Sequence, residues 1–386
     1  MSNCASDYAF SNQEQCFAVA EASCGVLTKP AGTNAIYTVG PGDFTQDREL
    51  LTDEQVRQYA SKLASIKGRL MVGDWSFASY VKPYGTAGQA PEHDILYQCL
   101  MGTKTPGGTV VYSLANQLDS FSLWYKKGHT VFAFRGCTVE KADFSVDGQA
   151  LSQVKWSGKF MERLWAGEAK TTGTYSIGNT VLTFVATGAL RYCPGMYVMV
   201  GADDNAGNGY QILSVNYTTD QITLASALLT NVGATPTVYP WLPTAGTEHG
   251  TPQNGKMGLV TIGAHNAIVL SATVSITNNI KYYDNQKNDV WTAEEFGRPG
   301  KRAISGNLQL YFLKSGLSYF YRSDYLITNA LIIPVGNVAG SIMEIAIPYA
   351  EYRTPKISGN EEFLQDVPFE AIASAAGNDE CSIVFK

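Results

Sequence analysis

Alternation of apolar and polar residues dominates this chain from Gly68 onward. In one stretch, Val154, Trp156, Gly158 and Phe160 alternate with polar or charged residues, and turns rich in Gly, Asn and Asp separate such stretches. A period of two places successive side chains on opposite faces of a β-strand. The 37 glycines and 22 tyrosines, with a charged fraction of only 16% against a usual ~25%, suit strands and turns. The pattern predicts a mainly β protein and excludes a coiled coil, a helical solenoid and a disordered chain.

Helices are expected at three places. Thr52 and Gln55 form a capping box, which predicts a helix from Thr52 to about Ile66, ended by Gly68. A short amphipathic helix is predicted over Glu92–Met101, and another near Leu317–Ile327.

The chain divides into four segments that differ in composition and in the pattern of predicted strands. Residues 1–67 are interpreted as an extended arm, with little regular structure up to residue 50, followed by the first helix. Residues 68–169 form a first β unit, residues 170–245 an inserted small all-β domain low in charge, and residues 246–386 a second β unit. The two flanks of the insertion resemble each other, since Phe121 precedes Val154 by 33 residues and Leu331 precedes Val367 by 36. This indicates an internal duplication of one β unit, with chance similarity between β-rich stretches as the alternative.

Motifs for nucleotide or metal binding fail on inspection. Gly250–Met257 nearly spells a phosphate loop but lacks the Ser or Thr that holds Mg²⁺, and a strand rather than a helix is predicted after it. Asp203–Gly209 hints at a calcium loop, but the acid required by an EF-hand falls at Ser214, so a turn is the better interpretation. We expect no metal and no cofactor.

Signs of catalysis are equally weak. The four histidines lack metal-ligand spacing, and the seven cysteines are scattered without a C-x-x-C pair, which favours reduced, mostly buried thiols. A Cys–His pair involving Cys137 stays open, although a structural thiol is favoured. We expect no enzymatic activity.

Charge and the ends of the chain suggest a soluble subunit. The 34 acidic and 28 basic residues give a net charge of −6, and no basic patch argues for tight phosphate binding. A surface so low in charge suits a subunit that buries much of itself against neighbours. The start resembles no signal peptide and no apolar run is long enough to span a membrane, so assembly in the cytosol is expected.

Six stretches of the chain match the pattern of one known family: Gly73–Lys82, Phe134–Val146, Ala272–Ile280, Phe296–Phe312, Met343–Tyr349 and Asp366–Ala371. They resemble the major tail tube proteins of long-tailed, siphovirus-type bacteriophages. The resemblance covers roughly residues 60–165 and 255–386. It implies a tail-tube-type β-sandwich or barrel with a flanking short helix, and subunits that join sheets edge to edge into rings.

According to the resemblance, the rings stack into a hollow tube that conducts viral DNA without binding it specifically. Some relatives carry a duplicated unit, so that three chains make a pseudo-sixfold ring, and a plain hexamer is the alternative. The implied partners are further copies of the chain and the tape measure, terminator and tip proteins of the tail. The implied location is the virion tail, after assembly in the host bacterial cytoplasm.

Contacts between subunits are expected from the arm of residues 1–50 and from a loop over residues 284–302. Trp291, Phe296 and Arg298 in that loop are typical anchor residues, although an ordinary surface loop is the alternative. The inserted domain is expected to decorate the tube exterior. Two other functions stay open: a β-rich surface protein or adhesin that binds host glycans, and a capsid decoration protein.

Overall fold

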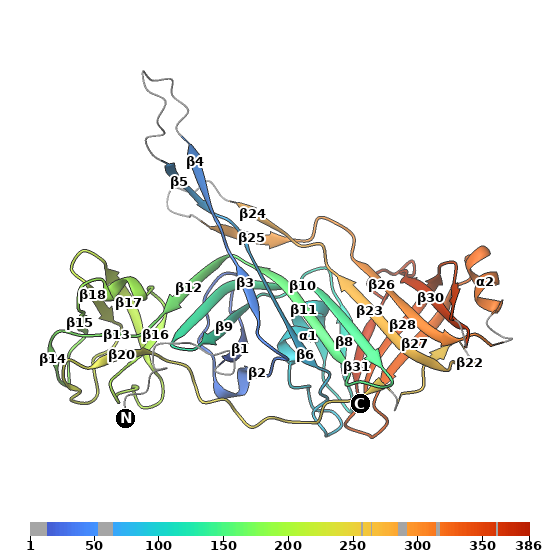
Figure 1. The fold of residues 1–386 in the computed structure, drawn as a ribbon, viewed down its shortest axis with the longest axis horizontal. Helices are drawn as coiled ribbons and strands as arrows, with labels where there is room; N and C mark the ends of the chain where they lie inside the picture. The colour runs from blue at the N-terminus through green and yellow to red at the C-terminus, as the bar shows by residue number, and fades with distance from the viewer. Residues whose placement is uncertain are drawn as a thin grey trace, which may run out of the picture.

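The computed structural model describes residues 14–52, 65–255, 258–263, 265–284, 292–313, 317–359 and 362–386. β-Strands dominate these residues, accompanied by two short α-helices, α1 (Asp94–Met101) and α2 (Leu317–Asp324). Figure 1 shows an elongated body with a small β unit at one end and strand pairs projecting from one side. The predicted mainly β class is confirmed.

Two halves of the body contain the same set of strands in the same chain order. The first half has β1 (Glu14–Ala20), β2 (Ala35–Ile36), β3 (Asp43–Thr45), β6 (Gly73–Tyr80), β9 (Phe121–Lys127), β10 (Thr130–Asp147), β11 (Gln153–Phe160) and β12 (Glu162–Ala166). The second half has β21 (Thr261–Ile262), β22 (His265–Asn266), β23 (Val269–Thr277), β26 (Ala303–Tyr311), β27 (Asn329–Val335), β28 (Met343–Tyr352), β30 (Leu364–Ala371) and β31 (Ser382–Phe385).

The pairing of these strands repeats as well. In the first half the antiparallel pairs are β1–β2, β1–β9, β9–β10, β10–β12, β10–β11, β11–β6 and β6–β3. In the second half they are β21–β22, β21–β27, β27–β28, β28–β31, β28–β30, β30–β26 and β26–β23. The repeat extends to a hairpin, β4 (Arg48–Thr52) with β5 (Ser65–Leu70) in one half and β24 (Lys281–Asp284) with β25 (Ala293–Gly297) in the other. The topology therefore supports the duplication suggested by the sequence.

Each half folds as two layers connected by one long strand. The first part of β10 pairs with β9 and β12 in an outer sheet, and its second part pairs with β11 in an inner sheet. The strand changes layers at Gly136, where φ is +63°, a conformation that favours glycine. The corresponding strand β28 divides in the same way between β27 and β31 on one side and β30 on the other.

One joint connects the halves. Lys141–Asp147 of β10 pairs with Ser271–Thr277 of β23, so the inner layers merge into a single sheet of order β3-β6-β11-β10-β23-β26-β30, hereafter the large sheet. The hairpin β7 (Gly102–Thr105) and β8 (Val110–Leu114) crosses from the first half and pairs with β31. Among the described strands the pairings branch but never return to their starting strand, so the chain alone closes no barrel.

The main core lies between the large sheet and the outer sheets. Trp156 and Tyr97, which α1 contributes, are almost fully buried there, and their rings make a T-shaped contact at 5.1 Å. Helix α1 ends at Gly102, whose φ is +98° and whose N–H donates to the Gln98 carbonyl. A glycine stop of this kind is a common helix ending, and the helix predicted over Glu92–Met101 is confirmed.

The inserted segment forms its own six-stranded sheet. Its strands are β13 (Ala169–Lys170), β15 (Val181–Thr183), β16 (Tyr197–Val200), β17 (Tyr210–Asn216), β18 (Gln221–Leu224) and β20 (Thr237–Pro240), with a small pair β14 (Thr174–Tyr175) and β19 (Gly233–Ala234). A second core forms around Tyr192, Met196 and Tyr210. It includes Phe17 and Trp124, so the inserted sheet packs on the outer sheet of the first half.

Two predictions near the N-terminus are wrong where the structure tests them. The described part of the predicted arm, residues 14–50, is not irregular throughout, because β1 pairs with β9 along its whole length and Phe17 is buried. The ends of the helix predicted from Thr52 to Ile66 lie instead in β4 and β5, where Leu51 is opposite Ile66. Residues 53–64 and 1–13 lie outside the described residues.

A buried histidine gives the fold a pH dependence. His93, directly before α1, is 2% exposed, and its Nε2 atom has no hydrogen-bond partner among the described residues. Burial lowers the pKa of His93 to about 3, and the charge of Lys82 adds to the shift.

We therefore expect the free energy of unfolding to fall as the pH drops below about 6.5, the ordinary histidine pKa. Below that pH the unfolded chain binds a proton at His93 that the folded chain does not bind. The contribution of His93 is about 1.4 kcal/mol per pH unit between about pH 6 and pH 4. Urea unfolding across this range should show the slope, and His93→Gln, which cannot titrate, should flatten it by that amount. Identical slopes in both proteins would contradict the assignment.

Candidate assembly surfaces

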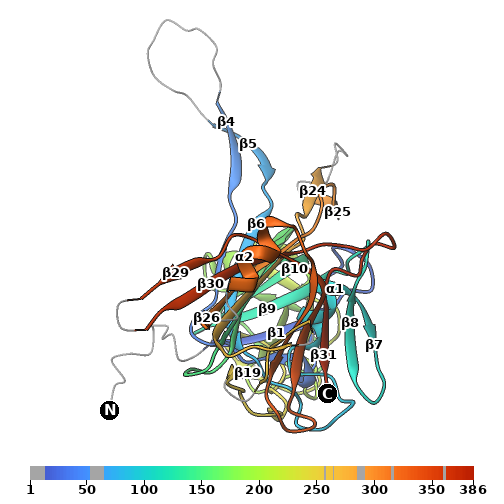
Figure 2. The same cartoon turned by 90° about the vertical axis from the view of Figure 1, so that its right-hand side faces the viewer.

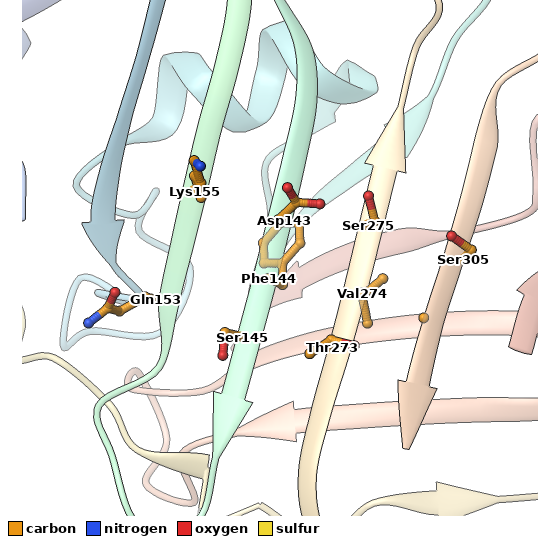
Figure 3. Close-up of a pocket in the computed structure, with 10 residues that line it drawn as sticks. Asp143, Phe144, Ser145, Gln153, Lys155, Thr273, Val274, Ser275 and Ser305 are labelled. Carbon is orange, nitrogen blue, oxygen red and sulfur yellow. The ribbon is translucent and has the colours of Figure 1, made fainter. Parts of the chain in front are cut away.

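One face of the large sheet is mostly polar. Along β10, Ala142, Phe144 and Val146 point into the core, so Asp143 and Ser145 point to the opposite face. On each neighbouring strand, alternation likewise sends every second side chain to this opposite face. Figure 3 shows the resulting row of short polar side chains across β11, β10, β23 and β26. They line a hollow of about 470 Å³ that includes Lys155, Thr273, Ser275 and Ser305.

Acidic groups outnumber lysines on this polar face. By strand alternation it carries Asp43, Asp74, Asp143, Asp147, Asp366 and Glu370 against Lys141, Lys155, Lys159 and Lys356. Lys141 and Asp143 form an ion pair of 2.8 Å within one strand. The face is therefore weakly acidic and rich in hydroxyl groups.

The joint between the halves is closed by polar contacts as well as by strand pairing. Asn278, which directly follows β23 and is fully buried, donates from Nδ2 to the carbonyls of Leu100 (2.9 Å) and Val139 (3.2 Å). Its Oδ1 accepts a hydrogen bond from Nε of Arg302 (3.0 Å), whose Nη2 donates to the Ala115 carbonyl. Every polar atom of this buried side chain is thus satisfied, which fixes the two halves to each other.

Two edges at the ends of the large sheet have no strand partner among the described residues. Among the described strands, β3 pairs only with β6, and the end of β28 (residues 351–352) pairs only with β30. A short strand, β29 (Lys356–Ser358), continues along the same side of β30. The two edges are the topological equivalents of the edges that meet in the β10–β23 joint. Unpaired edges present free N–H and C=O groups to another chain.

The hairpin β4–β5, hereafter the arm, projects from the body on the same side as β24–β25 (Figures 1 and 2). Its described part carries three exposed apolar side chains: Leu50 (66%), Leu51 (49%) and Ile66 (58%). Clustered apolar groups on a protruding hairpin are typical of an interaction surface.

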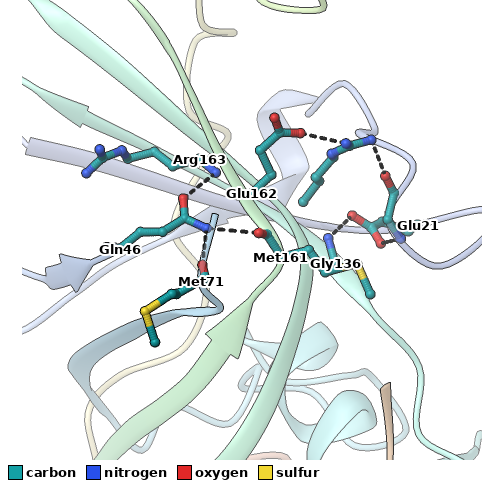
Figure 4. Close-up of polar contacts among 9 residues, drawn as sticks. Glu21, Gln46, Met71, Gly136, Met161, Glu162 and Arg163 are labelled. Atoms are coloured by element: carbon teal, nitrogen blue, oxygen red, sulfur yellow. Dashed lines mark hydrogen bonds and ion pairs between the residues drawn. The ribbon is translucent and has the colours of Figure 1, made fainter. Parts of the chain in front are cut away.

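The base of the arm is held by Gln46, as Figure 4 shows. Its Nε2 donates to the carbonyls of Met71 and Met161, each at 2.9 Å, and its Oε1 accepts from the N–H of Arg163 at 3.0 Å. One side chain therefore ties both ends of the arm to the corner between β11 and β12.

Figure 4 also shows a contact where β10 changes layers. There the Glu21 carboxylate accepts a hydrogen bond from the Gly136 N–H at 2.8 Å.

Two of the three anchor residues predicted from the sequence, Phe296 and Arg298, lie in and beside β25. Trp291 lies outside the described residues. Phe296 is half-buried against Tyr282, with ring centroids 5.6 Å apart, and Nη2 of Arg298 lies 3.4 Å from Oδ1 of Asn116. Both side chains contact their own chain at the base of the β24–β25 hairpin, and their role between subunits stays a prediction.

Asp203 in the inserted sheet organises turns. It accepts hydrogen bonds from the Tyr210 hydroxyl (2.8 Å) and from the N–H groups of Asn205 (3.1 Å) and Thr230 (2.8 Å). Burial opposes ionisation of Asp203, but these hydrogen bonds outweigh it and hold the pKa below the ordinary value. The carboxylate is used within the chain, as the interpretation of this segment as a turn requires.

The remaining sequence motifs also have structural roles. Gln253 lies within the segment that resembles a phosphate loop. Its N–H donates to the Val81 carbonyl and its carbonyl accepts from the Ser152 N–H, so the backbone at Gln253 is an extended link beside the first half. Burial raises the pKa of Cys137 well above its ordinary value, which disfavours the reactive thiolate. In the described part of the chain no cluster of three or more His, Cys, Asp or Glu has metal-binding geometry, and no described helix is long and apolar enough to cross a membrane.

Comparison with known protein families gives a match. A family model described as "Phage tail tube protein" matches residues 11–371, which is nearly the whole chain and includes the inserted segment. No curated protein matches it.

Proposed function

We propose that this chain, which belongs to the phage tail tube protein family and is a structural component of the virion tail, closes into rings of three copies. The β10–β23 joint carries the proposal. It connects two halves of equal topology. Within the described part of the chain, the equivalent edges, residues 351–352 of β28 and β3, have no partner at the two ends of the large sheet. The same joint formed between chains would satisfy both edges. Six halves in a ring then correspond to three chains.

The equivalence of the halves predicts which residues meet. If Val154 of β11 corresponds to Val367 of β30, then Lys141 corresponds to Glu351 and Thr277 to Thr45. Lys141 lies opposite Thr277 in the joint within the chain. Glu351 of one copy is therefore expected opposite Thr45 of the next.

The polar face of the large sheet lines the lumen in this arrangement. Its excess of carboxylates repels phosphate, so DNA passes to the host without adhering. The inserted sheet packs on the opposite side of the body, against the outer sheet of the first half, and so decorates the tube exterior. The arm and the β24–β25 hairpin project together and contact the next ring. Other tail proteins meet the ends of the tube.

Disulfide trapping tests the joint. In a Cys24→Ser background, which removes the exposed thiol found among the described cysteines, Thr45→Cys with Glu351→Cys should give covalent trimers on mild oxidation, in particles that electron microscopy shows as threefold rings. Thr45→Cys with Glu370→Cys is the matched control, because Glu370 lies one strand farther from the edge. Two strand spacings, about 9.6 Å, would then separate the two cysteines, which is too far for a disulfide. Equal cross-linking in both variants, or closed rings of another copy number, would overturn the proposal.

A further inference from the structure

Helix α2 leaves apolar side chains uncovered on the outside of the second half. Tyr319 packs against its own half, with its ring 6.1 Å from that of Tyr352. On and just beyond the helix, Tyr321 is 56% exposed, Tyr325 67% and Leu326 61%, and the rings of Tyr321 and Tyr325 lie 4.5 Å apart. Exposed apolar patches of this kind typically mark surfaces that bind another protein.

The topological equivalent of α2 is α1, and α1 is buried. Both helices lie in the connection between equivalent strands, β6 to β9 in the first half and β26 to β27 in the second. Helix α1 fills the space where the two halves meet. The ring of its Tyr97 lies 5.1 Å from that of Phe385, and the Tyr97 hydroxyl lies 3.9 Å from the sulfur of Met343, both in the second half.

We propose that α2 fills the corresponding space between two copies of this chain, packing on the first half of the next copy in the ring. This inference rests on the ring proposed above. The occupant is a second copy because the chain already shows the contact once, between its own halves.

The receiving surface follows from the same equivalence. Met343 is opposite Phe385 in the second half, and Phe132 is opposite Trp165 at the matching position of the first half. Met343 and Phe385 are buried, whereas Phe132 and Trp165 are only half-buried. The positions that α1 covers in one half thus stay partly open in the other.

A groove extends this open site. The outer edge of β31 is covered by β8, whereas that of β12 is covered by the inserted segment, where the Cys193 N–H donates to the Trp165 carbonyl at 2.9 Å. Beside it lies a groove of about 1180 Å³ lined by Trp165, Leu190, Arg191 and Tyr239, among others. Leu190 is 55% exposed, so the groove offers apolar and aromatic surface to Tyr325 and Leu326 of the neighbouring copy.

The test compares two pairs of exposed residues. Tyr321→Ser with Tyr325→Ser should raise the protein concentration at half-maximal ring formation by about tenfold or more, because buried tyrosines dominate many interfaces. Leu213→Ser with Leu229→Ser, at 66% and 51% exposed on the inserted segment, should leave it unchanged. All four positions are exposed, so thermal unfolding of the unassembled chain should not change.

A second measurement addresses the contact directly. Tyr325→Cys with Leu190→Cys should cross-link neighbouring copies through a short bismaleimide. This inference would be overturned if the ring-forming concentration is unchanged and this cross-link does not form. If Thr45→Cys with Glu351→Cys still traps trimers in that case, the ring proposal stands. Failure of the Thr45–Glu351 trap would instead overturn the ring on which it rests.

Discussion

Replacing Leu50, Leu51 and Ile66 by serine should leave rings intact and abolish tubes. All three side chains lie on the described part of the arm, and Leu51 is directly opposite Ile66. Fully burying one Leu or Ile is worth about 1.5–3 kcal/mol. Each ring of the proposed assembly would present three arms, so their contributions would add at every contact between rings. Sedimentation velocity and electron microscopy should find single rings in place of tubes.

The matched control for this variant is Leu259→Ser, which is as exposed, at 57%, but lies outside the arm. It should form tubes of normal length. Tubes of normal length from the triple variant would show that the apolar groups of the arm take no part in stacking.

Trp156→Ala should destabilise the folded chain by about 3–5 kcal/mol. The side chain is fully buried at the centre of the main core, where its ring contacts Tyr97 and Phe144. Its Nε1 donates to the Ser79 hydroxyl at 2.8 Å. The substitution therefore leaves a cavity and an unpaired buried hydroxyl group at once.

Chemical denaturation of the unassembled chain measures this loss. Trp165→Ala is the comparison, because Trp165 is half-buried at an outer edge and its removal should cost about 1 kcal/mol or less. Equal losses in the two variants would contradict the central place given to Trp156.

Local patterns predicted much of the fold because they report directly on strands. Alternation located β6, β11 and most of β10, and the Gly102 stop located the end of α1. The weak repeat between the flanks matched equivalent strands, since β9 corresponds to β27 and β11 to β30. Alternation did not show that the stretches before and after Gly136 form one strand, because a change of layer interrupts the period there.

Long-range pairing explains the errors. β1 is a strand because β9, about a hundred residues later, supplies its hydrogen bonds, and nothing in residues 14–20 reveals that partner. The capping box at Thr52 is a local signal, yet Leu51 and Ile66 face each other across a hairpin. The sequence likewise did not predict which residues line the proposed lumen. The outward face of a strand depends on the layer that packs against its other face.

The anchor residues show the limit of assigning sites by residue type. Phe296 has the side chain of an interface anchor, but the structure places its ring on Tyr282 of the same chain. The exposed apolar groups lie elsewhere, at Leu50, Leu51 and Tyr325, in segments that the sequence did not distinguish from ordinary helices or loops.

The β10–β23 joint also changes the thermodynamics of assembly. In the proposed ring, three chains lose two sets of translational and rotational freedom on assembly, whereas six unlinked halves would lose five. Half of the joints are intramolecular and form at an effective concentration that does not depend on how much protein the infected cell has made. Linkage further allows the two copies to diverge. The inserted segment follows β12 of the first half, so the proposed ring of three copies would display three such outer modules.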